Sequence, residues 1–353
     1  MTRRPAASDD VLDEILSATR RVHEELRNDI RGALAGEPLW MAGVSDDSAA
    51  GDTIYEIDRV CEARLFELLA EHFARWLPVI VVAEGLPDAG HGEGVAVMPP
   101  GADCRQSRLC LVVDPIDGTR GLMYGKRSAW ILTGIVIRQK STPLIPRLSD
   151  IDVAVQTEVP PVKQTYADTL WAVRGRGAFG QRTDLTRDQH TDITLAPSRA
   201  KNIEHGFGQV MRAFPGGRDI LAAVDDDICL GALGPGQAGK AKAFEDQYIS
   251  TAGQIAELAY GHDRWCADLR PLLAPVLAAR GQTPLLCCHP YDICTALVAE
   301  ELGILISTPA GDRLDPPLQV HHDVAWVGYA NKDIRAQVEP LLRASLRKHR
   351  LMP

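Results

Sequence analysis

The most constraining feature of this chain is a run of strand-forming residues that ends in two closely spaced aspartates. Residues 107–115, SRLCLVVDP, predict a buried β-strand that ends at Asp114. Asp117 follows shortly afterwards, and Gly118 and Thr119 come directly after it. Two carboxylates this close repel each other unless a cation lies between them. The hypothesis that this pair of aspartates raises is a metal ion at the end of the strand, with a phosphate on its far side.

A second predicted strand also ends in an acid. Residues 77–84, LPVIVVAE, are rich in β-branched residues and end at Glu84. Side chains at strand ends can meet at one rigid edge of a sheet, and carboxylates gathered there require a cation. Hard oxygen ligands select Mg²⁺, Mn²⁺ or Ca²⁺ rather than zinc, and two such ions about 3.5–4 Å apart would clamp a phosphoryl group. The acidic strand ends therefore predict a divalent-cation site.

The segment DPIDGT, residues 114–119, has two interpretations. As a site, Pro115 stiffens the turn and fixes the carbonyl of Ile116 as a further ligand, while Gly118 lets a phosphate approach the backbone N–H groups of 118 and 119. Thr119 adds a hydroxyl that can orient an attacking water. As plain structure, Asp, Pro and Gly are all turn formers. Residue chemistry alone leaves both interpretations open.

Composition and charge exclude several classes of protein. The chain has 353 residues and a net charge of -9, which argues against a nucleic-acid surface. An acidic protein repels phosphate unless bound cations compensate. No apolar run approaches the roughly 20 residues that span a bilayer, and the N-terminus lacks the apolar core of a signal peptide, so we expect a cytoplasmic protein without membrane partners. None of the eight cysteines forms a C-x-x-C pair, which favours reduced thiols.

The periodicity of apolar residues predicts an α+β fold. Helical spacing appears over residues 9–34 and 53–75, and further strands are predicted with mostly short connections that favour antiparallel pairing. The polar segment 176–210 contains a domain boundary near residue 190. We predict an antiparallel-sheet domain, 1–190, which carries Glu84 and DPIDGT, packed on a smaller α/β domain, 191–353, which carries Asp292. The remaining predicted strands are 129–138, 151–158, 169–175, 284–288, 304–307 and 323–329, and the remaining helices are 216–229, 251–261, 292–303 and 331–348.

Read as a whole, DPIDGT resembles the D-P-[IL]-D-G-[TS] signature of the magnesium-dependent, lithium-sensitive inositol monophosphatase and fructose-1,6-bisphosphatase superfamily. Four other segments are similar to family motifs and occur in the family's order, which makes the resemblance far more specific than one motif. It extends over roughly residues 50–330. The four segments are DTIYEIDRVCE (52–62), VVAEG (81–85), GRGAFGQR (175–182) and HPYDICTALVAEELGILIS (289–307).

The resemblance implies a layered α-β-α-β-α sandwich and metal-assisted hydrolysis of a small phosphorylated polyol or sugar. It implies Mg²⁺ as cofactor, with two or three ions and Mn²⁺ as a substitute, and a homodimer. Glu84 and Thr119 would orient water, with Asp58 in the outer shell of the site. The implied metal ligands are Glu84, Asp114, Ile116, Asp117 and Asp292, and Gly118 and Thr119 would contact the phosphate.

The chain departs from the family pattern at a few positions. Gly85 stands where the family has a second acid, which leaves the third ion open, and Tyr291 stands where Trp is commonest. An extra stretch follows residue 262. In it, Arg264 and Asp268 are predicted to bind a sugar hydroxyl or a second phosphate, together with Arg270. The alternative for these charges is a solvated helix face with an internal ion pair.

Two other functions are compatible with these residues. One is a 3'(2'),5'-bisphosphate nucleotidase, which would need an adenine pocket. The other is a catalytically silent relative that binds phosphorylated metabolites, although the acids of the motif are intact. Asp292 also has a purely structural alternative, because it precedes an apolar helix and suits an N-cap.

Overall fold

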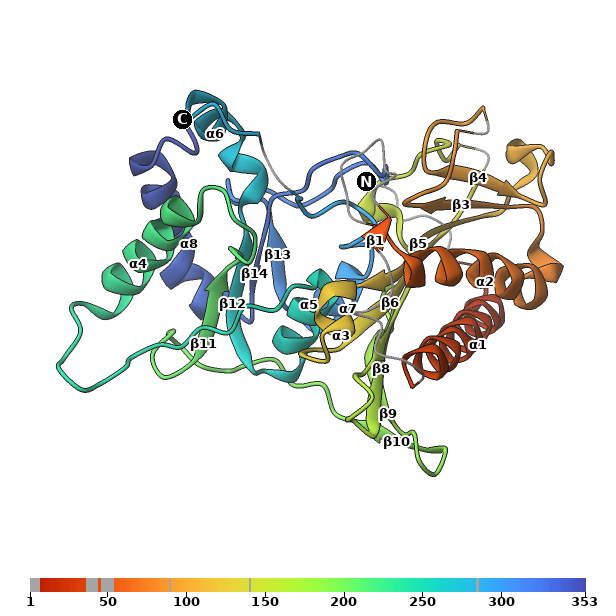
Figure 1. Cartoon of the computed structure of the whole chain (residues 1–353), viewed down its shortest axis with the longest axis horizontal. Coiled ribbons are helices and arrows are strands. Elements are labelled where there is room, and N and C mark those ends of the chain that lie inside the picture. The colour runs from red at the N-terminus through yellow and green to blue at the C-terminus, as the bar shows by residue number, and fades with distance from the viewer. Residues whose placement is uncertain (1–6, 36–43, 46–53, 89, 140, 284–285) are drawn as a thin grey trace.

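Two β-sheets organise the molecule. The computed structural model describes residues 7–35, 44–45, 54–88, 90–139, 141–283 and 286–353, and of residues 44–45 and 54–60 it describes the backbone alone (Figure 1). The first sheet has the strand order β10-β9-β8-β7-β6-β5-β3-β4, and the second has the order β11-β12-β14-β13. Two very short strands, β1 (Val44–Ser45) and β2 (Ile54–Tyr55), pair separately.

The first sheet is antiparallel except at one pair of strands. β3 and β5 run parallel, with Ala83 opposite Val113, so their carboxyl ends lie at the same edge of the sheet. This pair carries Glu84 and DPIDGT to that edge. The strands are β3 (Val79–Ala83), β4 (Val95–Met98), β5 (Leu109–Asp117), β6 (Ala129–Ile137), β7 (Val153–Val159), β8 (Tyr166–Val173), β9 (Gly177–Asp184) and β10 (Gln189–Ile193).

The second sheet contains a strand that the sequence did not indicate. Its strands are β11 (Phe207–Val210), β12 (Asp263–Asp268), β13 (Leu305–Ser307) and β14 (Trp326–Tyr329). The alternative of a solvated helix face for Arg264 and Asp268 was wrong, because β12 lies in the sheet between β11 and β14 with Trp265, Cys266 and Ala267 buried. The internal ion pair of that alternative is present, between Asp268 and Arg270. Three apolar residues between charged ones are too short a run for periodicity to separate strand from helix.

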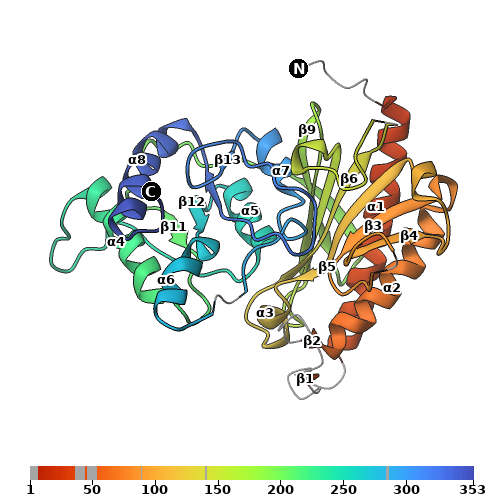
Figure 2. The ribbon, with the colours of Figure 1, turned by 90° about the horizontal axis from the view of Figure 1, so that it is seen from above.

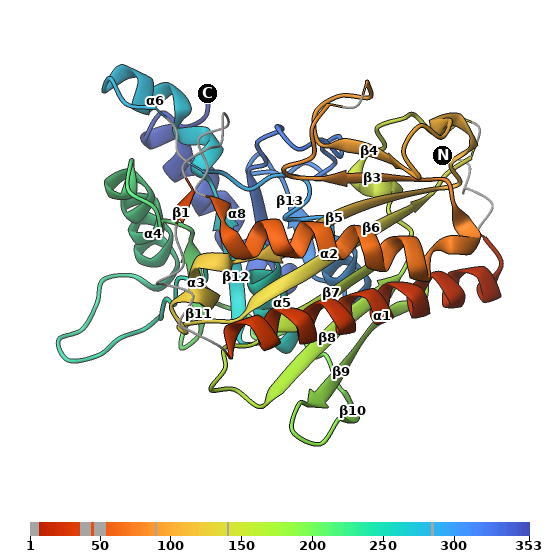
Figure 3. The same ribbon diagram turned by 45° about the vertical axis from the view of Figure 1, so that its right-hand side comes forward.

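Helices complete a five-layer arrangement, as predicted (Figure 2). α1 (Asp9–Leu34) and α2 (Glu56–His72) lie side by side on the outer face of the first sheet (Figure 3). α5 (Thr251–Tyr260) and α7 (Ala296–Glu301) pack between the two sheets. The far face of the second sheet is covered by α4 (Arg218–Leu233) and α8 (Lys332–Lys348), with α6 (Ala274–Ala279) beside them. The short helices are η2 (Ala74–Trp76), η3 (Cys104–Gln106), α3 (Thr119–Met123), η4 (Leu148–Asp150) and η5 (Arg270–Leu273).

A buried histidine fixes α1 to the first sheet. His23 is fully buried, and its ring nitrogens contact the hydroxyls of Thr133 at 2.8 Å and Thr157 at 3.1 Å. Burial lowers the pKa of His23 to about 3, so the ring is neutral at physiological pH. Its two hydroxyl partners satisfy both nitrogens, and its role is structural.

Several predicted boundaries differ from the structure. β4, β9, β10 and β11 are not among the predicted strands, and residues 286–288 are not a strand, while 284–285 lie outside the described residues. The predicted boundary near residue 190 stays a prediction, since one hydrophobic cluster draws on both sheets. None of the eight cysteines, all of which lie among the described residues, is paired in a disulfide. In the part of the chain that is described, no helix is long and apolar enough to cross a membrane.

Candidate active site

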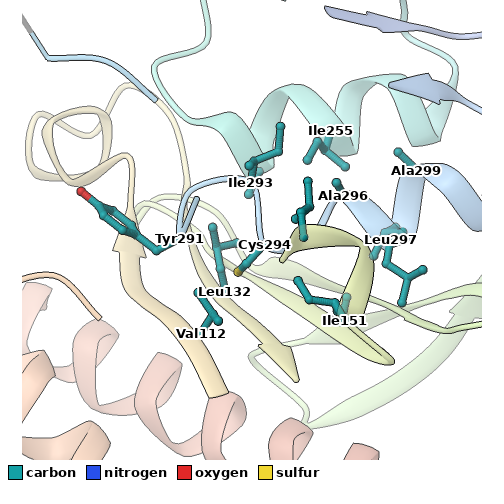
Figure 4. Close-up of a cluster of buried hydrophobic side chains, with 14 of the residues drawn as sticks. Val112, Leu132, Ile151, Ile255, Tyr291, Ile293, Cys294, Ala296, Leu297 and Ala299 are labelled. Carbon is teal, nitrogen blue, oxygen red and sulfur yellow. The ribbon is translucent and has the colours of Figure 1, made fainter. Parts of the chain in front are cut away.

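Three carboxylates from distant parts of the chain converge at the edge of the first sheet. Asp114 and Asp117 come from the end of β5, and Asp292 comes from the segment before α7. Each offers a carboxylate oxygen, and these oxygens all lie within 4.8 Å of one another. Directly after Asp292, Ile293 and Cys294 are buried in the core between the sheets, where Ile293 points toward Ile255 and Cys294 lies next to Leu132 and Val112 (Figure 4). We call these three aspartates the acidic cluster.

An irregularity in β5 aims the two nearby aspartates. The pairing register of β5 with β6 shifts between Asp114 and Asp117, and such bulges redirect side chains at strand ends. Asp114 Oδ1 accepts a hydrogen bond of 2.9 Å from the backbone N–H of Ile116. Gly118 then adopts φ 93°, and an added Cβ there would lie 3.1 Å from the carbonyl oxygen of Ile249. Only glycine fits this position without strain.

Asp117 is anchored to the start of α5. Its Oδ2 accepts hydrogen bonds from Ser250 Oγ at 2.8 Å and from the N–H of Ala252 at 2.9 Å. Ser250 is also the N-cap of α5, because its hydroxyl accepts from the N–H of Gly253. The positive end of α5 therefore faces the cluster and stabilises the Asp117 carboxylate.

Asp292 is not a helix N-cap. α7 begins at Ala296, later than the predicted start at residue 292, and its N-cap is Thr295. Asp292 Oδ2 instead accepts a 2.6 Å hydrogen bond from the N–H of His289, within a turn that precedes the helix. The capping alternative is therefore wrong, and the carboxylate is held toward the other two acids.

The electrostatics of the acidic cluster call for a cation. Burial, followed by the charges of Asp117 and Asp292, raises the pKa of Asp114 well above its ordinary value. Burial likewise raises the pKa of Asp117 to about 6, and burial and the Asp117 charge raise that of Asp292. Three carboxylates that resist ionisation together form a donor set suited to a hard divalent cation, so the residues fit Mg²⁺ or Mn²⁺. Their roles as metal ligands stay predictions.

The predicted ligand Ile116 and the predicted catalytic Thr119 are in direct contact. Thr119 Oγ1 donates a 2.9 Å hydrogen bond to the carbonyl oxygen of Ile116. This bond fixes the hydroxyl at the start of α3, next to the acidic cluster. A hydroxyl that donates to a carbonyl can in addition accept a hydrogen bond from water.

Glu84 lies close enough to the acidic cluster to interact with it electrostatically. It lies in the turn after β3, and its charge contributes to the raised pKa of Asp114 and of Asp292. Tyr291 donates a side-chain hydrogen bond to Glu84. The Tyr291 hydroxyl also lies 3.2 Å from His289 Nδ1, and the two rings stack with centroids 5.3 Å apart.

Tyr291 is a functional candidate that the sequence did not single out beyond its difference from the family. We expect Tyr291→Phe to lower kcat/KM about tenfold, because Glu84 loses a hydrogen bond that orients its carboxylate. Steady-state kinetics and calorimetric Mg²⁺ titration would measure the effect. Tyr329→Phe removes another buried tyrosine hydroxyl away from the cluster and serves as the control. Unchanged kinetics for Tyr291→Phe would contradict a role in orienting Glu84.

A carboxylate from α2 lies beside Gly85, where the family has a second acid. Gly85 has φ 77°, and an added Cβ would lie 2.6 Å from Glu62 Oε1. The position therefore lacks an acidic side chain of its own but has one next to it. The side chain of Asp58, earlier in α2, lies outside the described residues.

The two predicted substrate-binding residues of β12 have other partners. Arg264 donates to the carbonyl oxygens of Asn202 and Glu204 at 2.6 and 2.5 Å, and no contact of Arg264 with the acidic cluster is found among the described residues. Asp268 is buried and accepts several hydrogen bonds from Arg270. Their role in substrate binding stays a prediction. Arg270 is the one close to the cluster, since its charge lowers the pKa of Asp117 and Asp292.

Comparison with known proteins supports the same fold. No family profile matches the chain, and no curated protein sequence matches it. Among solved structures, it is similar to extragenic suppressor protein suhB from Bartonella henselae (15% identity, TM-score 0.62, 93% of this chain and 98% of the other). It is also similar to the IMPase of Thermotoga maritima (14% identity, TM-score 0.59, 95% of this chain and 98% of the other). A third similar structure is the Leishmania major fructose-1,6-bisphosphatase in holo form (14% identity, TM-score 0.64, 95% of this chain and 94% of the other).

The fold is thus that of the inositol monophosphatase and fructose-1,6-bisphosphatase superfamily, over nearly the whole chain. The resemblance predicted from DPIDGT and the ordered motifs is confirmed at the level of the fold. These structural relatives are titled as phosphatases of both branches, inositol monophosphatase and fructose-1,6-bisphosphatase, or as suhB. At identities of 14–15% they do not distinguish one substrate from another.

Proposed function

We propose that this chain is a Mg²⁺-dependent phosphate monoester hydrolase that acts on a small phosphorylated polyol or sugar. The observation that carries the proposal is the convergence of Asp114, Asp117 and Asp292 within 4.8 Å. Acids from separate segments do not gather in a buried setting without a compensating charge. The fold, shared with phosphatases over most of the chain, adds support.

The reaction is the attack of a water oxygen on phosphorus with loss of the alcohol. When bound, the divalent cations would neutralise phosphate charge and favour ionised oxygen at the attacking and leaving positions. Asp114, Asp117 and Asp292, with the Ile116 carbonyl, would hold them. Water supplies the proton that the departing alcohol takes up, so no covalent intermediate with the protein is required.

Glu84 and Thr119 are proposed to orient the attacking water. The Thr119 hydroxyl is fixed by its donation to Ile116, and Glu84 is oriented by Tyr291. A carboxylate and a hydroxyl can each accept a hydrogen bond from the same water, which sets the direction of its oxygen lone pair, and the carboxylate can then take up a proton as the water attacks. Gly118 leaves its side of the phosphate site without a side chain.

A phosphate-release screen tests the proposal. The substrates are inositol phosphates, sugar mono- and bisphosphates and adenosine 3',5'-bisphosphate, each with Mg²⁺, Mn²⁺ or EDTA. We expect release from a polyol or sugar ester with Mg²⁺ and none with EDTA. Preference for the adenosine ester would favour the nucleotidase alternative. Binding of esters without release from any of them would favour the silent relative.

Lithium sensitivity is a further expected result. Li⁺ is a small cation that favours oxygen ligands, so we expect inhibition at millimolar concentrations when it competes at the acidic cluster. The assay is phosphate release against increasing LiCl, with NaCl at equal ionic strength as the control. Equal responses to the two salts would contradict a second, exchangeable cation site and leave the fold unaffected.

A further inference from the structure

A cavity that is separate from the acidic cluster lies beside the second sheet. It is bounded by β11, by α4 and by the loop after α4, residues 234–245, which extends from the side of the molecule (Figure 1). The cavity has a volume of about 280 Å³, and its lining does not include any aspartate of the acidic cluster. The proposed hydrolysis gives this cavity no role.

One side of the cavity is apolar and is fixed by the fold. Trp265 of β12 is buried there, and an added Cβ at Gly208 would collide with its indole ring. The loop after α4 returns alongside β11, because Gly208 donates to the carbonyl of Phe244 and Phe244 donates to that of Gly206, both at 3.0 Å. Leu230 and Phe244, which also line the cavity, are 55% and 42% exposed. The cavity therefore offers open apolar surface to a ligand.

The other side of the cavity carries acids that the protein does not fully compensate. Asp225 and Asp226 come from α4, and Glu245 comes from the end of the loop. Arg212 is the nearest cation, and its guanidinium donates to Glu245 and to the carbonyl of Val210. Arg212 Nη1 lies 3.6 Å from Asp225 Oδ2, which is too far for a hydrogen bond. Asp225 Oδ1 is buried and has no hydrogen-bond partner among the described residues.

The remaining charged groups at the cavity leave this need unmet. Lys242 donates a 2.7 Å hydrogen bond to the carbonyl of Leu233, the last residue of α4. Lys240 is exposed, and in the described part of the chain it forms no ion pair with the three acids. Burial raises the pKa of the Cys229 thiol to about 12, so the thiol is neutral. The carbonyl end of α4 adds partial negative charge, which favours a cation.

The protonation of Asp225 reflects the same shortage of positive charge. Burial raises the pKa of Asp225 to about 7, and the charges of Glu245 and Asp226 raise it further against the opposing effect of Arg212. At neutral pH the carboxyl is therefore partly protonated. A cation that enters the cavity would favour the ionised form.

We infer that this cavity binds a small organic amine, with its ammonium group paired with Asp225 and its apolar part between Leu230 and Phe244. A bare metal ion fits less well. In the described part of the chain, the three acids of the cavity do not bring their oxygens within 4.8 Å of one another, as those of the acidic cluster do. The apolar wall would also gain nothing from an ion. The inference does not depend on the reaction at the acidic cluster.

Calorimetric titration with phenethylamine and with 2-phenylethanol tests the inference. The two compounds share the ring and the chain length, and only the amine carries a charge. We expect phenethylamine to bind the wild type about tenfold more tightly than the alcohol, because its ammonium forms a charge-assisted hydrogen bond to Asp225. In Asp225→Asn the two affinities should become similar.

Asp219→Asn provides the matched control. Asp219 is an exposed acid of the same helix that pairs with Arg280 outside the cavity, so its loss should leave the preference for the amine unchanged. Equal binding of amine and alcohol by the wild type would overturn the inference. An unchanged preference in Asp225→Asn would also overturn it, and so would tighter binding of 3-phenylpropionate than of the amine.

Proton release identifies the group that the amine contacts. The titrations at pH 7 are repeated in phosphate and in Tris, whose enthalpies of ionisation differ. The wild type should release protons as the amine binds, since Asp225 becomes ionised, and Asp225→Asn should release none. Binding to the wild type without proton release would place the amine away from Asp225 and refute the site. All of these titrations are read without turnover, so they stand or fall independently of the hydrolase proposal.

Discussion

Asp117→Asn is expected to reduce kcat/KM by about a thousandfold or more while the chain keeps its fold. The substitution removes one negative charge from the acidic cluster without changing the size of the side chain. The amide oxygen of Asn can still accept from Ser250 and Ala252, so the anchorage to α5 survives. The lost cation affinity and transition-state stabilisation amount to about 4 kcal/mol, which corresponds to that factor.

The measurement combines kinetics with two readouts that do not need turnover. Calorimetric titration with Mg²⁺ should show weaker binding, and circular dichroism should show an unchanged fold. Asp246→Asn is the control, because Asp246 is an exposed acid that pairs with Arg127 outside the cluster. Turnover of Asp117→Asn within about tenfold of the wild type would refute the ligand role assigned to Asp117.

The part of the site that the sequence predicted is the part encoded by local chemistry. DPIDGT begins within the last residues of a strand that is buried on both faces, and acids at the end of such a strand must lie at a sheet edge. The parallel pairing of β3 with β5 then brings Glu84 to the same edge. The convergence of Asp292 came from the order of the motifs, because no local pattern reports which distant segment packs against a strand end.

Other features depend on tertiary contacts that leave no local pattern. β12 is a strand because its three buried apolar residues lie between two other strands, and its charged ends obscure the alternation. The orientation of Glu84 by Tyr291 joins the turn after β3 to the turn before α7. The position of Phe214 between Arg120 and Arg270 joins three separate segments. Of these residues only Arg270 belonged to a predicted substrate element, and Asp268, two residues before it, is its structural partner.

The metal-free protein is expected to lose stability as the pH rises from about 4 to about 7, and Mg²⁺ is expected to reverse that trend. The folded-state pKa values of Asp114, Asp117 and Asp292 lie above the ordinary value of 3.8. Below that value the carboxyls are protonated in both states, so their contribution to stability is fully present. This contribution is lost as the pH rises through the pKa values of the folded state, and the pKa of Asp117 is about 6.

The size of the effect follows from the shift. Raising the pKa of the Asp117 carboxyl from 3.8 to about 6 corresponds to roughly 3 kcal/mol of folding free energy across the titration. The other two aspartates act in the same direction. A divalent cation binds the ionised cluster in the folded state alone, so its stabilisation grows as the protons leave. The gain in Tm on adding Mg²⁺ should therefore be larger at pH 8 than at pH 5.

Thermal unfolding at pH 5–8 measures how Tm depends on pH in EDTA and in Mg²⁺. A variant of one acid outside the acidic cluster separates the contribution of the cluster from that of other buried acids. Burial raises the pKa of Asp225 to about 7, so this residue also weakens the metal-free protein as the pH rises. In Asp225→Asn, the Tm in EDTA should depend less on pH, and Mg²⁺ should still raise the Tm. In Asp117→Asn, the Tm in EDTA should also depend less on pH, but most of the increase in Tm with Mg²⁺ should be lost. Asp225 does not belong to the acidic cluster, so its variant serves as the control. If Mg²⁺ still raises the Tm of Asp117→Asn as it does in the wild type, the cation binds elsewhere, and the carboxylates at the end of β5 would then need another explanation.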